Sequence, residues 1–154
     1  MVTFNVIFSI VSGFLTLLIA ATVACIAYWQ YALARERFKL DMFEKRFAVY
    51  KATQRFLSVI LRAGKVDMDK LFEFRRDTQD AAFLFGQEIP AYLKRLDEQA
   101  LDLWEISKRR CDMPVGEEKS LLCREETGLL HALIGELPNL KNVFASYLKF
   151  DKWK

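Results

Sequence analysis

The sequence predicts an all-helical protein: one apolar N-terminal transmembrane helix, continuous with the first helix of a four- to five-helix bundle. Residues 1–34 contain no Asp, Glu, Lys or Arg, so all 23 basic and 20 acidic side chains lie beyond them. Only 6 Gly and 3 Pro occur among 154 residues, and the frequent turn signals that strands require are missing. We therefore divide the chain into an anchor, residues 1–33, and a helical domain, residues 34–154.

The anchor prediction depends on residues 6–29, which are almost wholly apolar. At a rise of ~1.5 Å per residue this segment is about 36 Å long, enough to cross a hydrocarbon core of ~30 Å with some tilt. Tyr28, Trp29 and Tyr31 follow at its downstream end. Aromatic side chains in that position are typical of the headgroup layer of a bilayer.

A basic cluster, Arg35, Arg37 and Lys39, comes directly after the apolar segment. The positive-inside rule places these residues, and the domain that follows, in the cytoplasm, with a short N-terminal tail outside. Two alternatives are a cleaved signal peptide ending at Ala34 and a lipoprotein modified at Cys25. Both need a basic segment before the apolar run, which the sequence lacks, and a signal peptide needs a much shorter run.

Small residues recur every four positions along the anchor, and such a stripe lets two membrane helices approach closely. The same pattern also arises simply because small residues are common in membrane helices. The stripe is a candidate helix–helix contact for self-association, formed by Ser12, Thr16, Ala20 and Ala24.

No Gly or Pro occurs between Gly13 and Gly64, so we expect one helix to run from the anchor into the domain, with Gly64 as its C-cap. Apolar residues at helical spacing predict its buried face. They are Phe43, Phe47, Tyr50, Phe56, Leu57, Ile60 and Leu61.

Capping residues predict where the next two helices begin and end. Asp67 is a suitable N-cap for a second helix, which residues 77–78 can interrupt and which ends near Gly86. A third helix begins around Ile89, with Pro90 in its first turn, where a missing N–H is harmless. Its predicted inner face comprises Tyr92, Leu93, Leu96, Ala100, Leu103, Trp104 and Ser107.

Residues 111–116 (CDMPVG) form the clearest predicted loop. A fourth helix is expected over residues 117–136, where Pro138 ends it, and a short final helix over residues 139–148. The predicted inner face of the fourth helix comprises Leu121, Leu122, Leu129, Leu130 and Leu133.

The composition argues against several kinds of chemistry. A net charge of +3 is modest and no nucleic-acid-binding motif is present, so we expect no nucleic-acid partner. His131 is the single histidine and follows two leucines, and no metal-binding cysteine or histidine spacing occurs, so we expect no metal and no cofactor. Cys111 and Cys123 flank the predicted loop, and free thiols are the usual state in the cytoplasm.

Three segments carry a resemblance to a family: residues 40–53 (LDMFEKRFAVYKAT), residues 83–93 (FLFGQEIPAYL) and residues 147–148 (YL). The chain resembles small uncharacterised single-span bacterial membrane proteins with a helical cytoplasmic domain. The resemblance implies a bacterial source and a tethered helical domain, and it brings no known activity. Together with the apolar segment and the basic cluster, it leads us to expect the bacterial inner membrane. Three charged residues inside it, Glu44, Lys45 and Arg46, are either ordinary surface ion-pair partners or a contact for a protein partner.

These observations predict a non-enzymatic, membrane-tethered interaction module, a scaffold, sensor or regulatory subunit. Its expected partners are the lipid bilayer and either another protein or a second copy of the chain. One alternative is a membrane-acting effector, such as a toxin or defence protein, that oligomerises through its transmembrane helix. A second is an enzyme with an unrecognised site, which a deep pocket with converging polar groups would favour.

Overall fold

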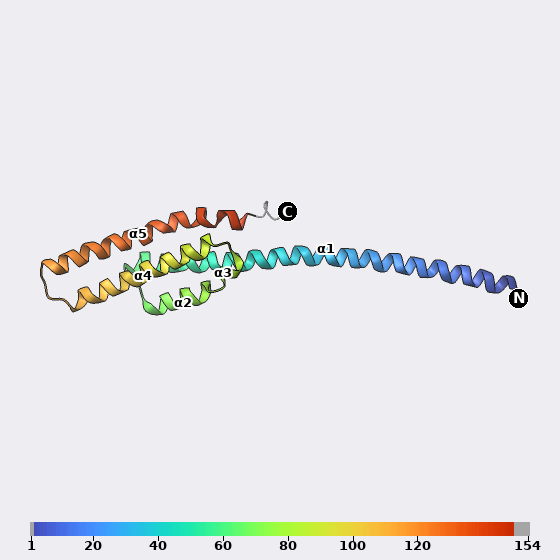
Figure 1. The fold of residues 1–154 in the computed structure, drawn as a ribbon, viewed down its shortest axis with the longest axis horizontal. Helices are drawn as coiled ribbons and strands as arrows, with labels where there is room; N and C mark the ends of the chain where they lie inside the picture. Colours follow the sequence, from blue (N-terminus) through green and yellow to red (C-terminus); the bar gives the residue numbers. More distant parts are fainter. Residues whose placement is uncertain (1, 150–154) are drawn as a thin grey trace. The chain divides into compact units, whose positions relative to one another are not determined.

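The computed structural model describes the backbone of residues 2–149 and the side chains of residues 13 and 15–149. All regular structure in this range is helical, which confirms the prediction of an all-helical protein (Figure 1). The chain divides into two compact units, residues 1–41 and residues 42–154, which are described separately. The helices are α1 (Val2–Ala63), α2 (Met68–Thr78), α3 (Ala81–Leu84), α4 (Glu88–Asp112) and α5 (Glu117–Leu148).

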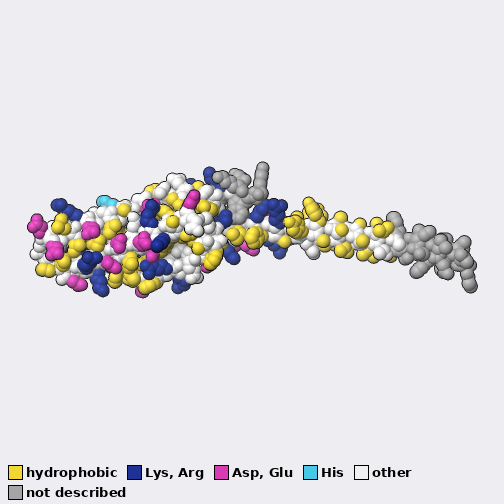
Figure 2. Space-filling view, viewed as in Figure 1, with side chains coloured by type: hydrophobic (Ala, Val, Ile, Leu, Met, Phe, Trp, Pro, Cys, Tyr) yellow, Lys and Arg dark blue, Asp and Glu magenta, His cyan; other side chains and the backbone are white. Residues whose placement is uncertain are grey.

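The first unit contains the N-terminal part of α1. The predicted continuity is confirmed, because α1 continues unbroken to Ala63. Of the helices in the described range, α1 alone is long and apolar enough to span a membrane. Its apolar side chains from Leu15 onward in this unit are uncovered, as the run of yellow atoms in Figure 2 shows. Those at least half exposed include Leu15, Leu17, Leu18, Ile19, Val23, Ile26 and Leu33.

In the second unit, α1 buries a face that is displaced from the predicted one. Phe56, Leu57 and Ile60 are buried as predicted, but Val49 is only 2% exposed while Leu61 is 48% exposed. The periodic pattern is wide enough to fit two neighbouring faces, and the contacts with the other helices select between them. Inclusion of Leu61 in the core was therefore wrong.

The connection between α1 and α2 follows the predicted capping chemistry. Gly64 has a φ of 64°, and its N–H donates to the carbonyl oxygen of Ile60 at 2.8 Å. Asp67 then caps α2, because its side chain accepts a hydrogen bond from the backbone N–H of Asp69. Gly64 adopts the left-handed conformation without steric cost, so the chain reverses here.

The second predicted helix is interrupted, but at residues 79–80 rather than at residues 77–78, which are the last residues of α2. α2 ends at Thr78, whose hydroxyl donates to the carbonyl oxygen of Phe74 at 2.8 Å, and the single turn of α3 precedes Gly86. α4 begins at Glu88, with Pro90 in its first turn, as predicted. It extends to Asp112, so the loop is shorter than predicted and begins at Met113.

The prediction that Pro138 ends a helix was wrong, because α5 continues through it to Leu148. The proline removes one backbone hydrogen bond, at a cost of about 3 kcal/mol. Leu133, Leu140 and Phe144, on either side of it, are almost completely buried. Burial of each such side chain contributes about 1.5–3 kcal/mol, which offsets that cost and keeps the helix intact.

The core of the second unit is aliphatic and aromatic, and all five helices contribute to it. Phe56 of α1 stacks on Phe74 of α2, with ring centroids 4.5 Å apart. The first turns of α5 bury no residue, and Leu121 is 60% exposed, so its predicted inward position was wrong. The α4–α5 turn therefore presents a largely uncovered end of the bundle.

Candidate functional site

The predicted basic cluster lies on α1 in the first unit. Arg35 and Arg37 are exposed, and Lys39 Nζ lies 3.1 Å from Glu36 Oε1. Arg35 and Lys39, four positions apart, share one side of the helix, whereas Arg37 points to the opposite side. The three cations therefore surround the helix rather than form a single patch.

The predicted small-residue stripe also lies on α1. Thr16, Ala20 and Ala24 are exposed and spaced at one helical turn, whereas the side chain of Ser12 lies outside the described residues. Because the stripe is exposed at these three residues, a helix of another molecule is a candidate partner for it.

The structure separates the three predicted partner-contact residues. Glu44 and Lys45 are exposed, whereas Arg46 is half-buried, and its Nε donates to the carbonyl oxygen of Leu84 at 2.7 Å. Its guanidinium also lies over the rings of Phe85 and Tyr147, at 5.7 and 5.8 Å from their centroids. Burial lowers the pKa of Arg46, which the nearby Tyr147 partly opposes.

These contacts form what we name the Arg46 clasp: Arg46, Leu84, Phe85, Gly86 and Tyr147. A Cβ at Gly86 would lie 2.9 Å from Tyr147 Oη, so the small residue permits the close approach of α5. The clasp joins the beginning of the second unit to its last helix. The resemblance segments thus meet in space, and Arg46 is engaged there by contacts within the chain.

Two further ion pairs hold α4 against its neighbours. Arg75 Nη2 of α2 lies 2.9 Å from Asp97 Oδ2. On the other side, Glu136 of α5 accepts hydrogen bonds from the Tyr92 hydroxyl at 3.2 Å and from Arg95 Nη2 at 2.8 Å. Burial, and then the Glu136 carboxylate, raise the pKa of Tyr92. These groups are occupied by one another and serve the packing of the bundle.

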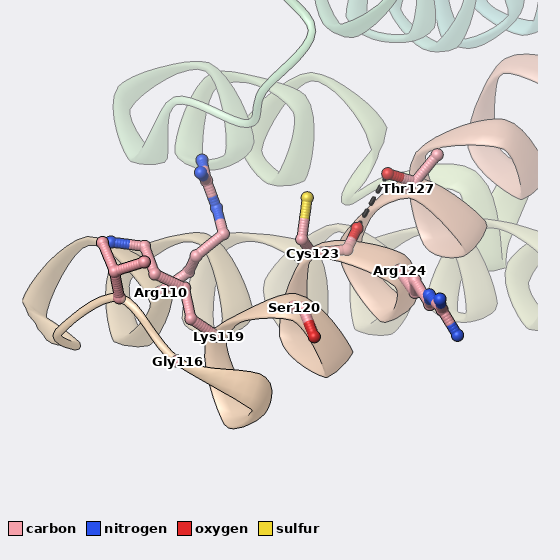
Figure 3. A pocket seen from close by; sticks show the side chains of 8 residues that line it. Arg110, Gly116, Lys119, Ser120, Cys123, Arg124 and Thr127 are labelled. Atoms are coloured by element: carbon pink, nitrogen blue, oxygen red, sulfur yellow. Dashed lines mark hydrogen bonds between the residues drawn. The ribbon is translucent and has the colours of Figure 1, made fainter.

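A hollow of about 570 Å³ lies at the α4–α5 turn (Figure 3). We name its lining residues the basic flank, since three of them are cationic and none is acidic. The basic flank comprises Arg110, Val115, Gly116, Lys119, Ser120, Cys123, Arg124 and Thr127.

Most polar groups of the basic flank already have partners in the chain. Arg110 Nε lies 2.5 Å from Glu126 Oε2, and Lys119 Nζ donates to the carbonyl oxygen of Met113 at 3.0 Å. Thr127 Oγ1 donates to the carbonyl oxygen of Cys123 at 2.8 Å, the dashed line in Figure 3. Arg124 lies apart from the other cations in the same view. The hollow therefore offers an open cationic surface, and its cations do not converge on one point.

A second hollow, of about 220 Å³, lies between the same two helices and has mainly acidic walls. We name its lining residues the acidic flank: Asp102, Glu105, Ile106, Arg109, Glu125 and Leu129. Sequence reasoning missed both flanks. The four-residue spacing of Lys119, Cys123 and Thr127 was the available signal, but which helix lies beside α5 can be seen only in the fold.

The described part of the chain brings no recognisable catalytic set together. His131 is exposed and lines neither flank, and Cys25, Cys111 and Cys123 are free and exposed. Among these residues no group of three or more His, Cys, Asp or Glu side chains is placed to hold a metal ion. Comparisons with protein families, curated proteins and solved structures find no match to the chain.

Proposed function

We propose that the chain is a membrane-tethered helical interaction module, without catalytic activity, that engages a protein partner or a second copy of itself. The observation that carries this proposal is the charge-free first half of α1, whose apolar side chains are uncovered from Leu15 onward, where the structure describes them. A lipid bilayer is the environment that covers such a surface without another protein.

The exposure of the apolar segment supports a membrane span over a core helix. A core helix of a soluble protein buries its apolar side chains, whereas none of the apolar window of α1 is buried. Leaving a Leu, Ile or Val side chain in water costs about 1.5–3 kcal/mol. At least seven such side chains, named above, are half or more exposed. Transfer of this segment into lipid removes that cost.

The residues that follow the apolar segment support a single orientation. Tyr28, Trp29 and Tyr31 are exposed and suited to the headgroup layer. Arg35 and Arg37 come next and resist transfer across the bilayer, and each adds about 1 kcal/mol of attraction to an anionic surface. Under this proposal the second unit lies in the cytoplasm of a bacterial cell, anchored at the inner membrane.

The second unit supports an interaction role rather than catalysis. Its interior is filled by aliphatic and aromatic side chains, and its two charged flanks are open surface hollows. Enzyme sites are usually concave pockets with a few converging polar groups. The flanks instead resemble the polar, accessible surfaces by which proteins choose partners.

Fractionation of cells that express the full chain tests the anchor. We expect the chain in the membrane pellet after alkaline carbonate washing, and a C-terminal tag that protease reaches only after the cells are opened. Recovery in the supernatant, or cleavage of the tag in intact cells, would refute the membrane proposal. Crosslinking in native membranes followed by mass spectrometry tests the interaction role, and a chain that crosslinks to nothing would contradict it.

A membrane-acting effector is a second candidate, favoured by the exposed stripe of Thr16, Ala20 and Ala24. Oligomerisation through this stripe would bring several anchors together in the bilayer. Overproduction of the chain should then collapse the membrane potential, measured with a voltage-sensitive dye. A potential that stays unchanged at high expression would reject this candidate and leave the interaction module.

A further inference from the structure

The hairpin formed by α4 and α5 carries opposite charges on its two sides. On α5, Cys123 and Thr127 lie one turn apart on the basic flank. Glu125 of the acidic flank is two positions from each of them, which places it about 200° around the helix. The two flanks are therefore opposite sides of the same helix.

The charge difference between the flanks is not removed by their internal ion pairs. Glu126 partly balances the three cations of the basic flank, which leaves a net charge of +2. Arg109, whose Nη2 lies 3.7 Å from Glu105 Oε2, partly balances the three acids of the acidic flank, which leaves −2.

The position of each flank is fixed by the packing of α5. Leu133 is fully buried on the face between the flanks, and the Glu126 side chain on the same face is 13% exposed. This inner face lies against α4, so α5 cannot rotate to mix the two sides without uncovering its core residues. The separation of charge is thus a property of the fold.

Apolar side chains lie beside the charges of each flank. Val115, which is 96% exposed, and Cys123 line the hollow of the basic flank. The half-buried Leu129 lines that of the acidic flank, together with Ile106, which is only 5% exposed. Apolar side chains beside complementary charges are typical of protein–protein contacts, and the charges select which surfaces meet.

We propose that the basic flank of one chain binds the acidic flank of a second copy, so that α4–α5 hairpins associate side by side. This inference rests on the proposed function, since anchoring in one membrane confines the copies and raises their effective concentration. The contact joins two different surfaces, so every added copy leaves one flank of each kind free. Such a contact builds rings or open chains of copies rather than pairs alone.

Disulfide trapping between the two flanks tests the contact in native membranes. The full chain carries Cys25→Ser and Cys111→Ser, which leaves Cys123 on the basic flank, and Arg109→Cys adds a thiol to the acidic flank. Within one chain these two thiols line different hollows, and a disulfide between them would leave a monomer, so only a contact between chains yields multiples. Mild oxidation should therefore produce dimers and higher multiples with Arg109→Cys, and monomer without it.

Three other results would overturn the contact. Monomer alone in the presence of both thiols means that the flanks do not meet. Dimers formed by Cys123 without Arg109→Cys mean that two basic flanks meet instead. Dimers with no higher multiples, even with both thiols, mean that association closes as a pair.

A charge exchange provides a second readout. Arg124→Glu on the chain that supplies Cys123 should reduce the crosslinked fraction at least tenfold. Glu125→Arg on the chain that supplies the Arg109→Cys thiol should also reduce it, since this change removes most of the negative charge of the acidic flank. Arg62→Glu, an equal change on an exposed residue of α1, should leave the crosslinked fraction unchanged. A crosslinked fraction that neither flank variant reduces would contradict the electrostatic match.

The same samples separate failure of the contact from failure of the anchor. A chain that pellets with the membrane but forms no multiples retains the proposed function and rejects the flank contact. A chain found in the supernatant rejects the anchor, and the presence or absence of multiples there still decides the flank contact.

Discussion

Truncation of Phe144 tests whether the segment of α5 beyond Pro138 is held by tertiary contacts. Phe144 is fully buried, and its ring meets those of Tyr50 and Phe85 edge-on, with centroids 5.6 and 5.5 Å apart. Phe144→Ala removes these contacts and leaves a cavity between α1, α5 and the residue that follows α3.

The expected loss of stability follows from this environment. Removal of a buried Phe side chain costs about 3–5 kcal/mol, with lost aromatic contacts of about 0.5–1.5 kcal/mol each contributing to the upper end. Domains of this size are stable by roughly 5–15 kcal/mol, so the variant should remain folded but unfold at a clearly lower denaturant concentration. Phe144→Leu, which fills most of the cavity, should lose less than half as much.

Urea unfolding of the full chain in detergent, followed by circular dichroism, measures the difference. Phe83→Ala is the matched control, because Phe83 is 87% exposed and its removal should change the free energy of unfolding by less than about 0.5 kcal/mol. A loss below 1 kcal/mol for Phe144→Ala, or equal losses for the two variants, would refute the explanation given for the helix across Pro138.

Three further predictions concern single contacts in the second unit. Arg46→Met removes the clasp hydrogen bond and should destabilise by about 1–3 kcal/mol in urea unfolding, whereas Lys45→Met, one position away and exposed, should be neutral. Asp67→Ala removes the N-cap of α2 and should lower the free energy of unfolding by about 0.5–2 kcal/mol. Asp69→Ala, at an exposed position in the same turn, should lower it by less, and equal losses for the two variants would argue against the cap. Tyr92 has a raised pKa, so the folded chain keeps a proton that the unfolded chain releases, and stability should fall as the pH rises above about 10. Tyr92→Phe should reduce that fall, and an unchanged pH profile would show that Tyr92 does not cause it.

The local signals of the sequence were sufficient for the helix boundaries on the N-terminal side of the second unit. Gly64 and Asp67 act through their own backbone and the next few residues, so their roles can be predicted without knowledge of the fold. The unbroken α1 likewise follows from the absence of Gly and Pro over its length. Each of these predictions concerns contacts within about one helical turn.

The incorrect predictions concern residues whose environment is set by distant segments. Pro138 would end an isolated helix, but the burial of side chains before and after it keeps α5 continuous. Leu61 and Leu121 fit the apolar periodicity of their helices, yet the neighbouring helices cover other faces. Tertiary contacts override helix propensity and apolar periodicity wherever they contribute more to the stability of the fold.

The candidate flanks could not be predicted for the same reason. Arg110 and Cys123 are thirteen positions apart in the chain and share a hollow only because α4 and α5 lie antiparallel. In the sequence, acidic and basic residues are mixed along α4 and α5. Their separation onto two sides of the hairpin depends on which face of α5 is buried.

Pro138 also divides α5 in the way its amides exchange with solvent. The residue has no amide proton, and it leaves the carbonyl oxygen of Ile134 without the backbone donor that the rest of the helix supplies. When α5 unfolds locally from its C-terminal end, one fewer backbone hydrogen bond has to break at Pro138 than at the other positions of the helix. Amides after Pro138 should exchange with deuterium as one group and those around Leu133 as a slower one, so one continuous helix behaves as two cooperative segments.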